Sequence, residues 1–161
     1  LPAFGLGMEE ADESLMNEYP RRKDESFFAN KLGLFIGLEG VMVGLITLAA
    51  YLIGHFIYES QIIAQTMAFL TLSGCQLFHA YNVKSQKSVF SKNIFKNKFL
   101  NFAFVVGFIL QMIVIYVPKL NEAFKLSPLS FDKLMICIGI SFVTVIVMEI
   151  SKLIKRISKK K

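Results

Sequence analysis

The chain has 161 residues, of which 54% are hydrophobic and 19% are charged, and its formal net charge is +6. Soluble domains average about 45–50% apolar residues on a count that also includes glycine. Basic surfaces that bind nucleic acid sit on soluble folds with a core of their own, whereas the positive charge here lies between long apolar runs. This pattern excludes a nucleic-acid partner and indicates a lipid bilayer.

The first segment, residues 1–31, opens on the apolar stretch Leu1–Gly7, which resembles the last turns of a helix. A secretory signal would begin with basic residues, continue with an unbroken apolar centre and end at small residues, and this stretch has none of these features. Acidic and basic side chains are clustered in the rest of the segment. We expect the end of a preceding transmembrane helix followed by a cytoplasmic loop.

Four later segments are apolar over the length that crosses a bilayer core, about 20 residues. A soluble four-helix bundle would need a charged face on every helix, and these segments lack one. The sequence therefore predicts an all-α polytopic membrane protein. Its bundle of four transmembrane helices is expected over residues 32–58, 62–83, 99–117 and 134–154.

The connections between these spans differ in charge. The short connection after the first span carries no Lys or Arg, and residues 118–133 carry only three of them. The other fifteen of the 18 lie before the first span, in the basic loop 84–98, or from Lys152 onward, at the end of the fourth span and in the tail 155–161. Because Lys and Arg are enriched in cytoplasmic connections, we expect both termini to be cytoplasmic and residues 118–133 to be extracytoplasmic.

Two acidic residues lie inside the predicted spans, Glu39 and Glu149. A charged side chain at the centre of a transmembrane helix costs about 2.5–3.5 kcal/mol on insertion scales, so Glu39 must face protein or water, or be protonated. Glu149 lies three residues before Lys152 near a helix end, where a surface ion pair explains both.

Glycines recur three and four residues apart in the first span, a spacing that permits another helix to approach closely. Simple helix flexibility is the alternative explanation of this pattern. The predicted packing groove consists of Gly33, Gly37, Gly40 and Gly44.

Several motifs follow one another in a recognisable order. "LPAFGLG" is followed by an acidic stretch and "YPRR", and "TMAF" and "QLFHAYNVKS" come later. "SVFSKNIFKNKFL", "VIYVPKLNEAFKLSPLSFDKL" and "MEISKLIKR" complete the series. Together they resemble the region from the sixth helix exit to the last helix of type II P-type cation-transporting ATPases, the calcium pumps in particular. No single motif is specific, but their order covers essentially the whole chain.

This resemblance implies the C-terminal transport segment of an ATP-driven cation pump, with calcium as the expected cation. The phosphorylation site, the nucleotide domain and five further helices would lie upstream. The segment would support the ion-binding helices and couple them to the phosphorylation domain through Pro20 and Arg21 in the first loop. The missing fifth helix would fill the glycine groove.

The resemblance also implies ATP, Mg²⁺ and calcium for a full pump. No cofactor and no catalytic residue is expected in this segment, which contains no phosphate-binding glycine-rich loop. The expected partners are the lipid bilayer and the upstream helices and phosphorylation domain of the same pump. A Lys-rich composition without Trp indicates a bacterial plasma membrane.

Candidate cation-site residues are the polar side chains inside the spans. Hard cations such as calcium take about 6–8 oxygen ligands, and this chain offers few. Gln76 stands where two-site calcium pumps of the family place a glutamate, which favours a single-calcium pump. His79 stands where sodium pumps of the family carry an acid, and a counter-transported proton is one role for it. Asn82 and Glu39 complete the candidates, and interhelical packing is the simpler explanation of each.

Two other kinds of membrane protein remain possible on the sequence. One is a stand-alone four-helix accessory or scaffold protein. The other is a small channel, which would need rings of charged side chains or carbonyl groups along a pore. Only Glu39 could contribute to such a ring. Codons for an Asp-Gly pair directly before Leu1 would support the pump, and a start codon there or at Met8 would support the stand-alone protein.

Overall fold

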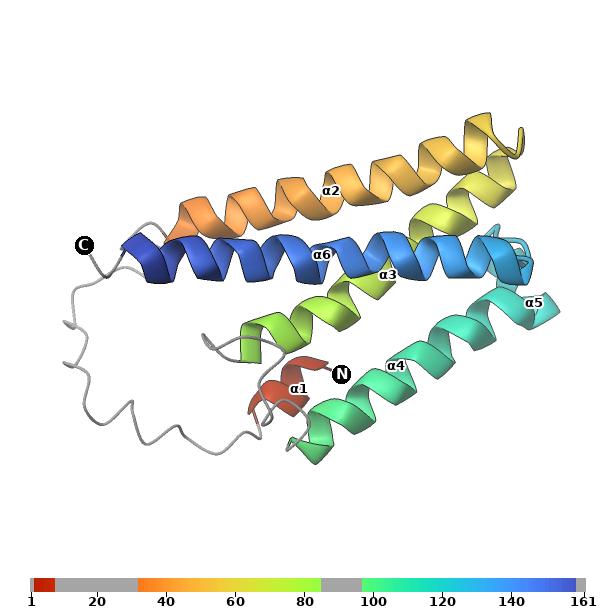
Figure 1. Ribbon diagram of the computed structural model, residues 1–161. Coiled ribbons are helices and arrows are strands. Elements are labelled where there is room, and N and C mark those ends of the chain that lie inside the picture. The colour runs from red at the N-terminus through yellow and green to blue at the C-terminus, as the bar shows by residue number, and fades with distance from the viewer. Residues whose placement is uncertain (1, 8–31, 85–96, 159–161) are drawn as a thin grey trace.

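The computed structural model describes residues 2–7, 32–84 and 97–158 (Figure 1). Over these residues the chain is helical and contains no strand, which confirms the predicted all-α fold. The helices are α1 (Pro2–Gly7), α2 (Leu32–Phe56), α3 (Gln61–Lys84), α4 (Lys98–Tyr116), α5 (Pro118–Ala123) and α6 (Phe131–Ser158).

Helix α3 lies at the centre of the bundle. It packs against α2 and α6 along much of its length, and it also contacts α4 and the short helix α1. Helices α3 and α6 run in the same direction, while α2 and α4 run in the opposite one (Figure 1). The buried side chains of α3 include both apolar and polar ones, and Met67, Thr66 and Thr71 are fully enclosed.

Residues 57–60 join α2 to α3 in a tight hairpin. The turn is closed by Glu59, whose backbone φ of 48° lies in the left-handed region. The Ser60 carbonyl accepts the first backbone hydrogen bond of α3, from Ala64 at 2.9 Å. Close to the turn, the Tyr51 hydroxyl donates to Oε1 of Gln61 at 3.0 Å. Because the connection is so short, α2 and α3 must pack antiparallel.

The connection from α4 to α6 is held by proline and by side-chain hydrogen bonds. Helix α4 begins after Asn97, whose side chain accepts from the Leu100 amide at 2.9 Å, and it ends at Tyr116. Pro118 then starts α5, since proline at the first turn of a helix loses no hydrogen bond. The Tyr116 hydroxyl donates to the Leu129 carbonyl at 2.8 Å and draws the connection against α4.

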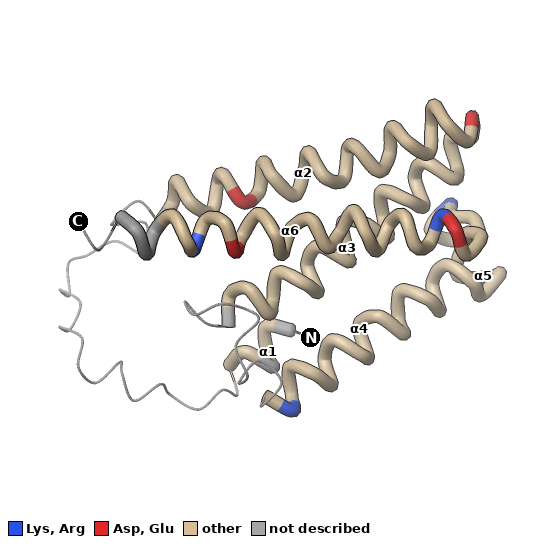
Figure 2. Tube along the Cα trace, viewed as in Figure 1, with Lys and Arg blue, Asp and Glu red and all other residues tan. Residues whose placement is uncertain are grey.

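Among the described residues, three helices are long and apolar enough to cross a membrane, over Gly33–Phe56, Lys98–Tyr116 and Phe131–Ile154. Their outer faces expose large apolar side chains, such as Leu45 and Phe102, as expected of a surface in contact with lipid. Most of the described length of each helix carries neither acid nor base (Figure 2). A membrane-embedded bundle accounts for both features.

Helix α3 differs from these three because it has the length but not the apolarity of a span. The physical reason is its central position, where polar side chains such as Thr66, Thr71 and Asn82 are buried against protein rather than lipid. Lipid demands apolar surface only where lipid makes contact. The assignment of residues 62–83 as a fourth span remains a prediction, which the position of α3 between α2 and α6 supports.

Candidate functional site

The interface between α3 and α6 is a polar seam of short side chains. The Ser141 hydroxyl lies 2.7 Å from the Cys137 carbonyl of its own helix and 3.2 Å from the Thr71 carbonyl of α3. One turn further along, the Thr144 hydroxyl donates to the Cys75 sulfur at 3.2 Å. Such hydrogen bonds between membrane helices are worth about 0.6 kcal/mol on average. The seam fixes how α3 lies on α6.

Among the described helices, close packing occurs at three further glycines, outside the predicted groove. A Cβ at Gly54 would clash with the Ala64 backbone across the hairpin, and one at Gly74 would lie 2.6 Å from the Ser141 hydroxyl. A Cβ at Gly107 of α4 would lie 2.7 Å from a Leu77 methyl group. These three positions therefore set the distances between neighbouring helices.

The predicted glycine groove of α2 faces away from the described helices. At Gly37, Gly40 and Gly44, an added Cβ would meet no described atom within 4 Å. Gly33 lies in the first turn of α2 and is half-buried. Within the described part of the chain, nothing fills this groove.

Glu39 and His79 are brought together across the α2–α3 interface. Oε2 of Glu39 lies 3.7 Å from Nε2 of His79, and their side chains are 30% and 22% exposed. When the imidazole is protonated, the two groups form an ion pair. At an effective dielectric constant of 20, two unit charges at about 4 Å attract by about 4 kcal/mol, which offsets the cost of placing a carboxylate inside a membrane helix.

His79 and Asn82 also carry polar atoms that have no partner among the described residues. These atoms are Nδ1 of the imidazole and both the oxygen and the nitrogen of the Asn82 amide. Asn82 is only 2% exposed, and it follows His79 by three residues, so the two side chains lie on neighbouring parts of one helix face. Buried polar groups in proteins are normally hydrogen-bonded, which makes this position unusual.

Gln76 lies apart from Asn82, because its side chain is exposed while that of Asn82 is buried. Other exposed residues of α3 lie at similar spacing along the helix, at Ile62, Gln65 and Leu72. Among the described helices, none covers this line of side chains. In the part of the chain that the structure describes, no three residues of the types His, Cys, Asp and Glu come close enough to hold a metal ion. Of the four candidates, Glu39 and His79 form a pair, Asn82 is a buried amide and Gln76 is an outward-facing amide. They do not surround a single cation site.

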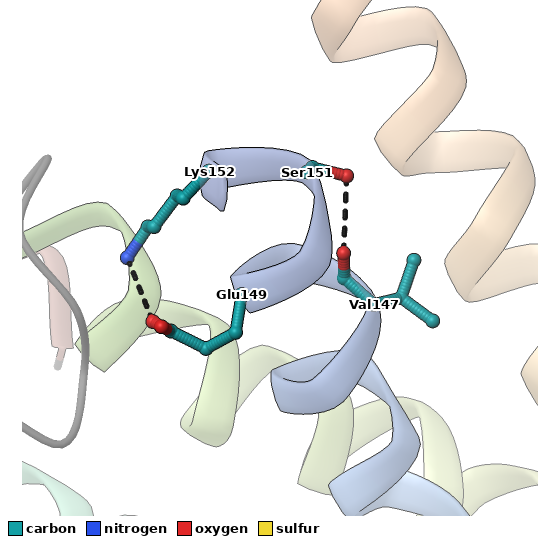
Figure 3. A network of polar contacts seen from close by, with 4 residues as sticks. All are labelled: Val147, Glu149, Ser151 and Lys152. Carbon is teal, nitrogen blue, oxygen red and sulfur yellow. Dashed lines mark hydrogen bonds and ion pairs between the residues drawn. The ribbon is translucent and has the colours of Figure 1, made fainter. Parts of the chain in front are cut away.

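Glu149 and Lys152 form an ion pair of 3.5 Å, but not at the surface (Figure 3). Their side chains are only 13% and 12% exposed, so the expectation of a surface ion pair is wrong. The physical reason is that α6 packs on α3 and does not face its surroundings all round. Between the two, Ser151 donates to the Val147 carbonyl at 3.0 Å (Figure 3). The proposed coupling residues Pro20 and Arg21 lie outside the described residues.

The contacts that the sequence analysis missed follow a simple rule. Glu39 and His79 are equally far along the chain from Glu59, and so are Gly54 and Ala64. In a tight antiparallel hairpin, residues at equal distances from the turn lie at the same height. Reading α2 and α3 in this register would have predicted both contacts from the sequence.

Comparison with known proteins extends the description. The family described as "Cation transporting ATPase, C-terminus" matches residues 1–154. The chain is 35% identical over 173 residues to calcium-transporting ATPase 1 of Bacillus cereus, covering 97% of this chain and 19% of the relative. It is 37% identical over 142 residues to a calcium-transporting ATPase of Bacillus subtilis, covering 88% and 16% respectively.

A relative from a distant organism matches over the same extent. The human calcium-transporting ATPase type 2C member 1 is 28% identical over 162 residues, which cover 99% of this chain and 17% of the relative. The chain thus spans less than a fifth of the length of these curated relatives. The match extends over nearly all of the chain, and the resemblance seen in the motifs is confirmed. The chain belongs to the family of cation-transporting ATPases, whose C-terminal membrane region it matches.

Proposed function

We propose that this chain is the C-terminal transport segment of an ATP-driven calcium pump in a bacterial plasma membrane. It supports the ion-binding helices of the pump and couples them to the phosphorylation domain. The observation that carries this proposal is the match to calcium-transporting ATPases from two Bacillus species over 97% and 88% of the chain. ATP, Mg²⁺ and calcium belong to the whole pump.

Two uncovered faces support a role as one part of a larger bundle. The groove of Gly37, Gly40 and Gly44 on α2 is open, and the side of α3 that carries Gln76 is exposed. Small residues let another helix approach closely, and an amide side chain is unfavourable against lipid. We assign both faces to upstream helices of the same pump, with Pro20 and Arg21 in contact with its phosphorylation domain.

Gln76 is the residue proposed to line the cation path. Its amide supplies an oxygen but no negative charge, and calcium sites usually combine several carboxylates and carbonyl groups. A single amide therefore lines or completes a site whose carboxylates come from upstream helices. This composition favours one calcium ion per cycle.

The test is ATP-dependent calcium uptake into inverted membrane vesicles that contain the full-length protein. Vesicles with the intact protein should accumulate calcium, and replacing Gln76→Glu should change the apparent calcium affinity or the number of calcium ions per ATP. The control is Gln65→Glu, which adds the same charge on the same exposed side of α3 but nearer the start of the helix. Absence of uptake would refute the pump, and equal behaviour of the two variants would reduce Gln76 to a packing role.

A further inference from the structure

One end of the bundle exposes large apolar side chains at or just beyond the limits of the membrane spans. At this end α2 stops, α3 begins, α4 passes into α5 and α6 begins (Figure 1). Phe56, Ile57, Phe124 and Phe131 are between 57% and 71% exposed there. A group of exposed apolar side chains of this size marks a contact with another apolar surface or with lipid.

The short helix α5 separates its exposed apolar side chains from a charged one. Asn121 is 7% exposed and donates to the Ile115 carbonyl, which fixes the face of α5 that lies against α4. Leu120 and Phe124, four residues apart, are exposed on one side of that face. At 3.6 residues per turn, the exposed Glu122 lies on its other side. Helices that lie in the plane of a membrane interface show this division.

The exposed apolar side chains occur on more than one side of the bundle. They belong to the end of α2, to α5 and to the start of α6. Helices α2 and α4 lie on opposite sides of α3 (Figure 1). A single partner helix would cover only one of these sides, whereas a bilayer surrounds the bundle on all of them. The exposed side chains also continue the lipid-facing surfaces of α2 and α4, where Leu45 and Phe102 are exposed.

The charges at this end of the bundle are balanced. Residues 57–60 and 117–133 contain three basic and three acidic residues, which are Lys119, Lys125, Lys133, Glu59, Glu122 and Asp132. Attraction to anionic headgroups requires an excess of Lys and Arg, so a contact here depends on apolar burial instead. The Tyr58 ring, which lies 4.6 Å from the Lys133 ammonium, adds an aromatic side chain of the kind enriched at membrane interfaces.

We propose that residues 56–58 and 117–131 form an interfacial anchor, which docks on the headgroup and upper acyl region of the bilayer. Phe56, Phe124 and Phe131 insert among the upper acyl chains, and Glu122 faces water. The partner is therefore a lipid surface, bound through apolar area and not through charge. Since α5 and the connection that follows it join α4 to α6, the anchor fixes the depth at which both helices sit in the membrane.

The test measures the depth of a nitroxide spin label on the full-length protein in vesicles of phosphatidylethanolamine and phosphatidylglycerol. The label is attached to Phe124→Cys or, as a second site, to Leu120→Cys. Cys75 and Cys137 are buried, and the unmodified protein treated in the same way supplies the background. Collisions of either label with oxygen, which dissolves in lipid, should exceed those with a water-soluble nickel chelate several-fold. The control is Glu122→Cys, where collisions with the nickel chelate should be the more frequent.

Three outcomes would overturn the proposal. If the nickel chelate reaches the labels at 120 and 124 as readily as the label at 122, the connection lies in water. If neither reagent reaches them, an upstream segment or a second copy of the protein covers this end. Vesicles of phosphatidylcholine alone should give the same depth, and loss of lipid contact there would mean that anionic headgroups hold the connection. The measurement needs neither ATP nor calcium, so its result does not depend on the proposed function.

Discussion

The two ends of α3 differ in whether their buried polar groups have hydrogen-bond partners among the described residues. Near the hairpin, the Thr66 hydroxyl donates to the Ile62 carbonyl at 2.8 Å and accepts from the Ser127 amide at 2.9 Å. Toward the other end, His79 Nδ1 and the Asn82 amide have no partner among the described residues. A buried polar group with partners stabilises a fold, whereas one without them weakens it. The hydrogen bonds of Thr66 stabilise the hairpin end, and we propose that the end with His79 and Asn82 serves function rather than stability.

The hairpin end is further stabilised by contacts that involve no transport residue. Asn121, 7% exposed, donates to the Ile115 carbonyl at 3.3 Å. The Lys133 ammonium lies 4.6 Å from the centre of the Tyr58 ring, within reach of a cation–π interaction. The first of these contacts anchors the connection 117–130 to α4, and the second joins the start of α6 to the 57–60 turn. This end of the bundle should respond to mutation with changes in stability alone.

The largest expected effect is at the hairpin. Gly54→Leu should lower the free energy of unfolding by about 3 kcal/mol or more, because overpacking typically costs 1–3 kcal/mol and here the added Cβ meets the Ala64 backbone. Thermal unfolding of the full-length protein in detergent measures it. Gly139→Leu is the control, since an added Cβ there meets no described atom within 4 Å. Equal loss of stability in both variants would contradict the close contact.

A smaller loss is expected from Thr66→Val. This change removes the acceptor of the Ser127 amide and leaves a partly buried N–H without a partner, which costs about 1–3 kcal/mol. The same thermal unfolding experiment detects it. Ser130→Ala, at an exposed position of the same connection, should have little effect. A stable Thr66→Val protein would mean that the connection does not depend on this bond.

Asn82→Leu should leave stability unchanged or raise it slightly. Replacing a buried polar group that has no partner among the described residues by an apolar one of similar volume removes a desolvation penalty. This outcome would be the opposite of that for Thr66→Val, although both side chains are buried in the same helix. A loss of 1 kcal/mol or more on Asn82→Leu would show that the amide is a structural residue, and the contrast between the two ends would no longer hold.

The smallest effect is expected from Tyr51→Phe. Its hydroxyl donates to Gln61 at an exposed site, and a typical hydrogen bond contributes about 0.5–1.5 kcal/mol net, with exposed ones at the low end. A shift of the unfolding midpoint near the limit of detection is expected, by the same assay. A large shift would mean that this bond, and not the glycine contact, holds the hairpin together.

The sequence was sufficient for the helical bundle but not for its contacts. Apolar length and the absence of charged faces predicted four long helices, because both depend on residues close together in the chain. The glycine spacing in α2 predicts a groove for an upstream helix, and this stays a prediction, since Gly40 faces away from the described helices while the close contact with α3 lies at Gly54. Spacing identifies a face that permits close approach and cannot identify what approaches it.

The polar candidates illustrate the same limit. Hydropathy singled out Glu39 and His79 as costly residues in a membrane, but treated them separately because they are far apart in the sequence. Only the hairpin register brings them to 3.7 Å. The burial of Glu149 and Lys152 depends on how α6 lies on α3, which no local pattern encodes. Pairwise geometry had to come from the structure.

The most direct test of the contrast between the ends of α3 compares calcium transport by the full-length protein carrying Thr66→Val or Asn82→Leu. Uptake per folded molecule is measured in the same vesicles, below the unfolding temperature of both variants. Thr66→Val should transport at the rate of the unmodified protein, while Asn82→Leu should transport more slowly. Normal transport by Asn82→Leu, together with slowed transport by Thr66→Val, would contradict the assignment of function to the end that carries His79 and Asn82.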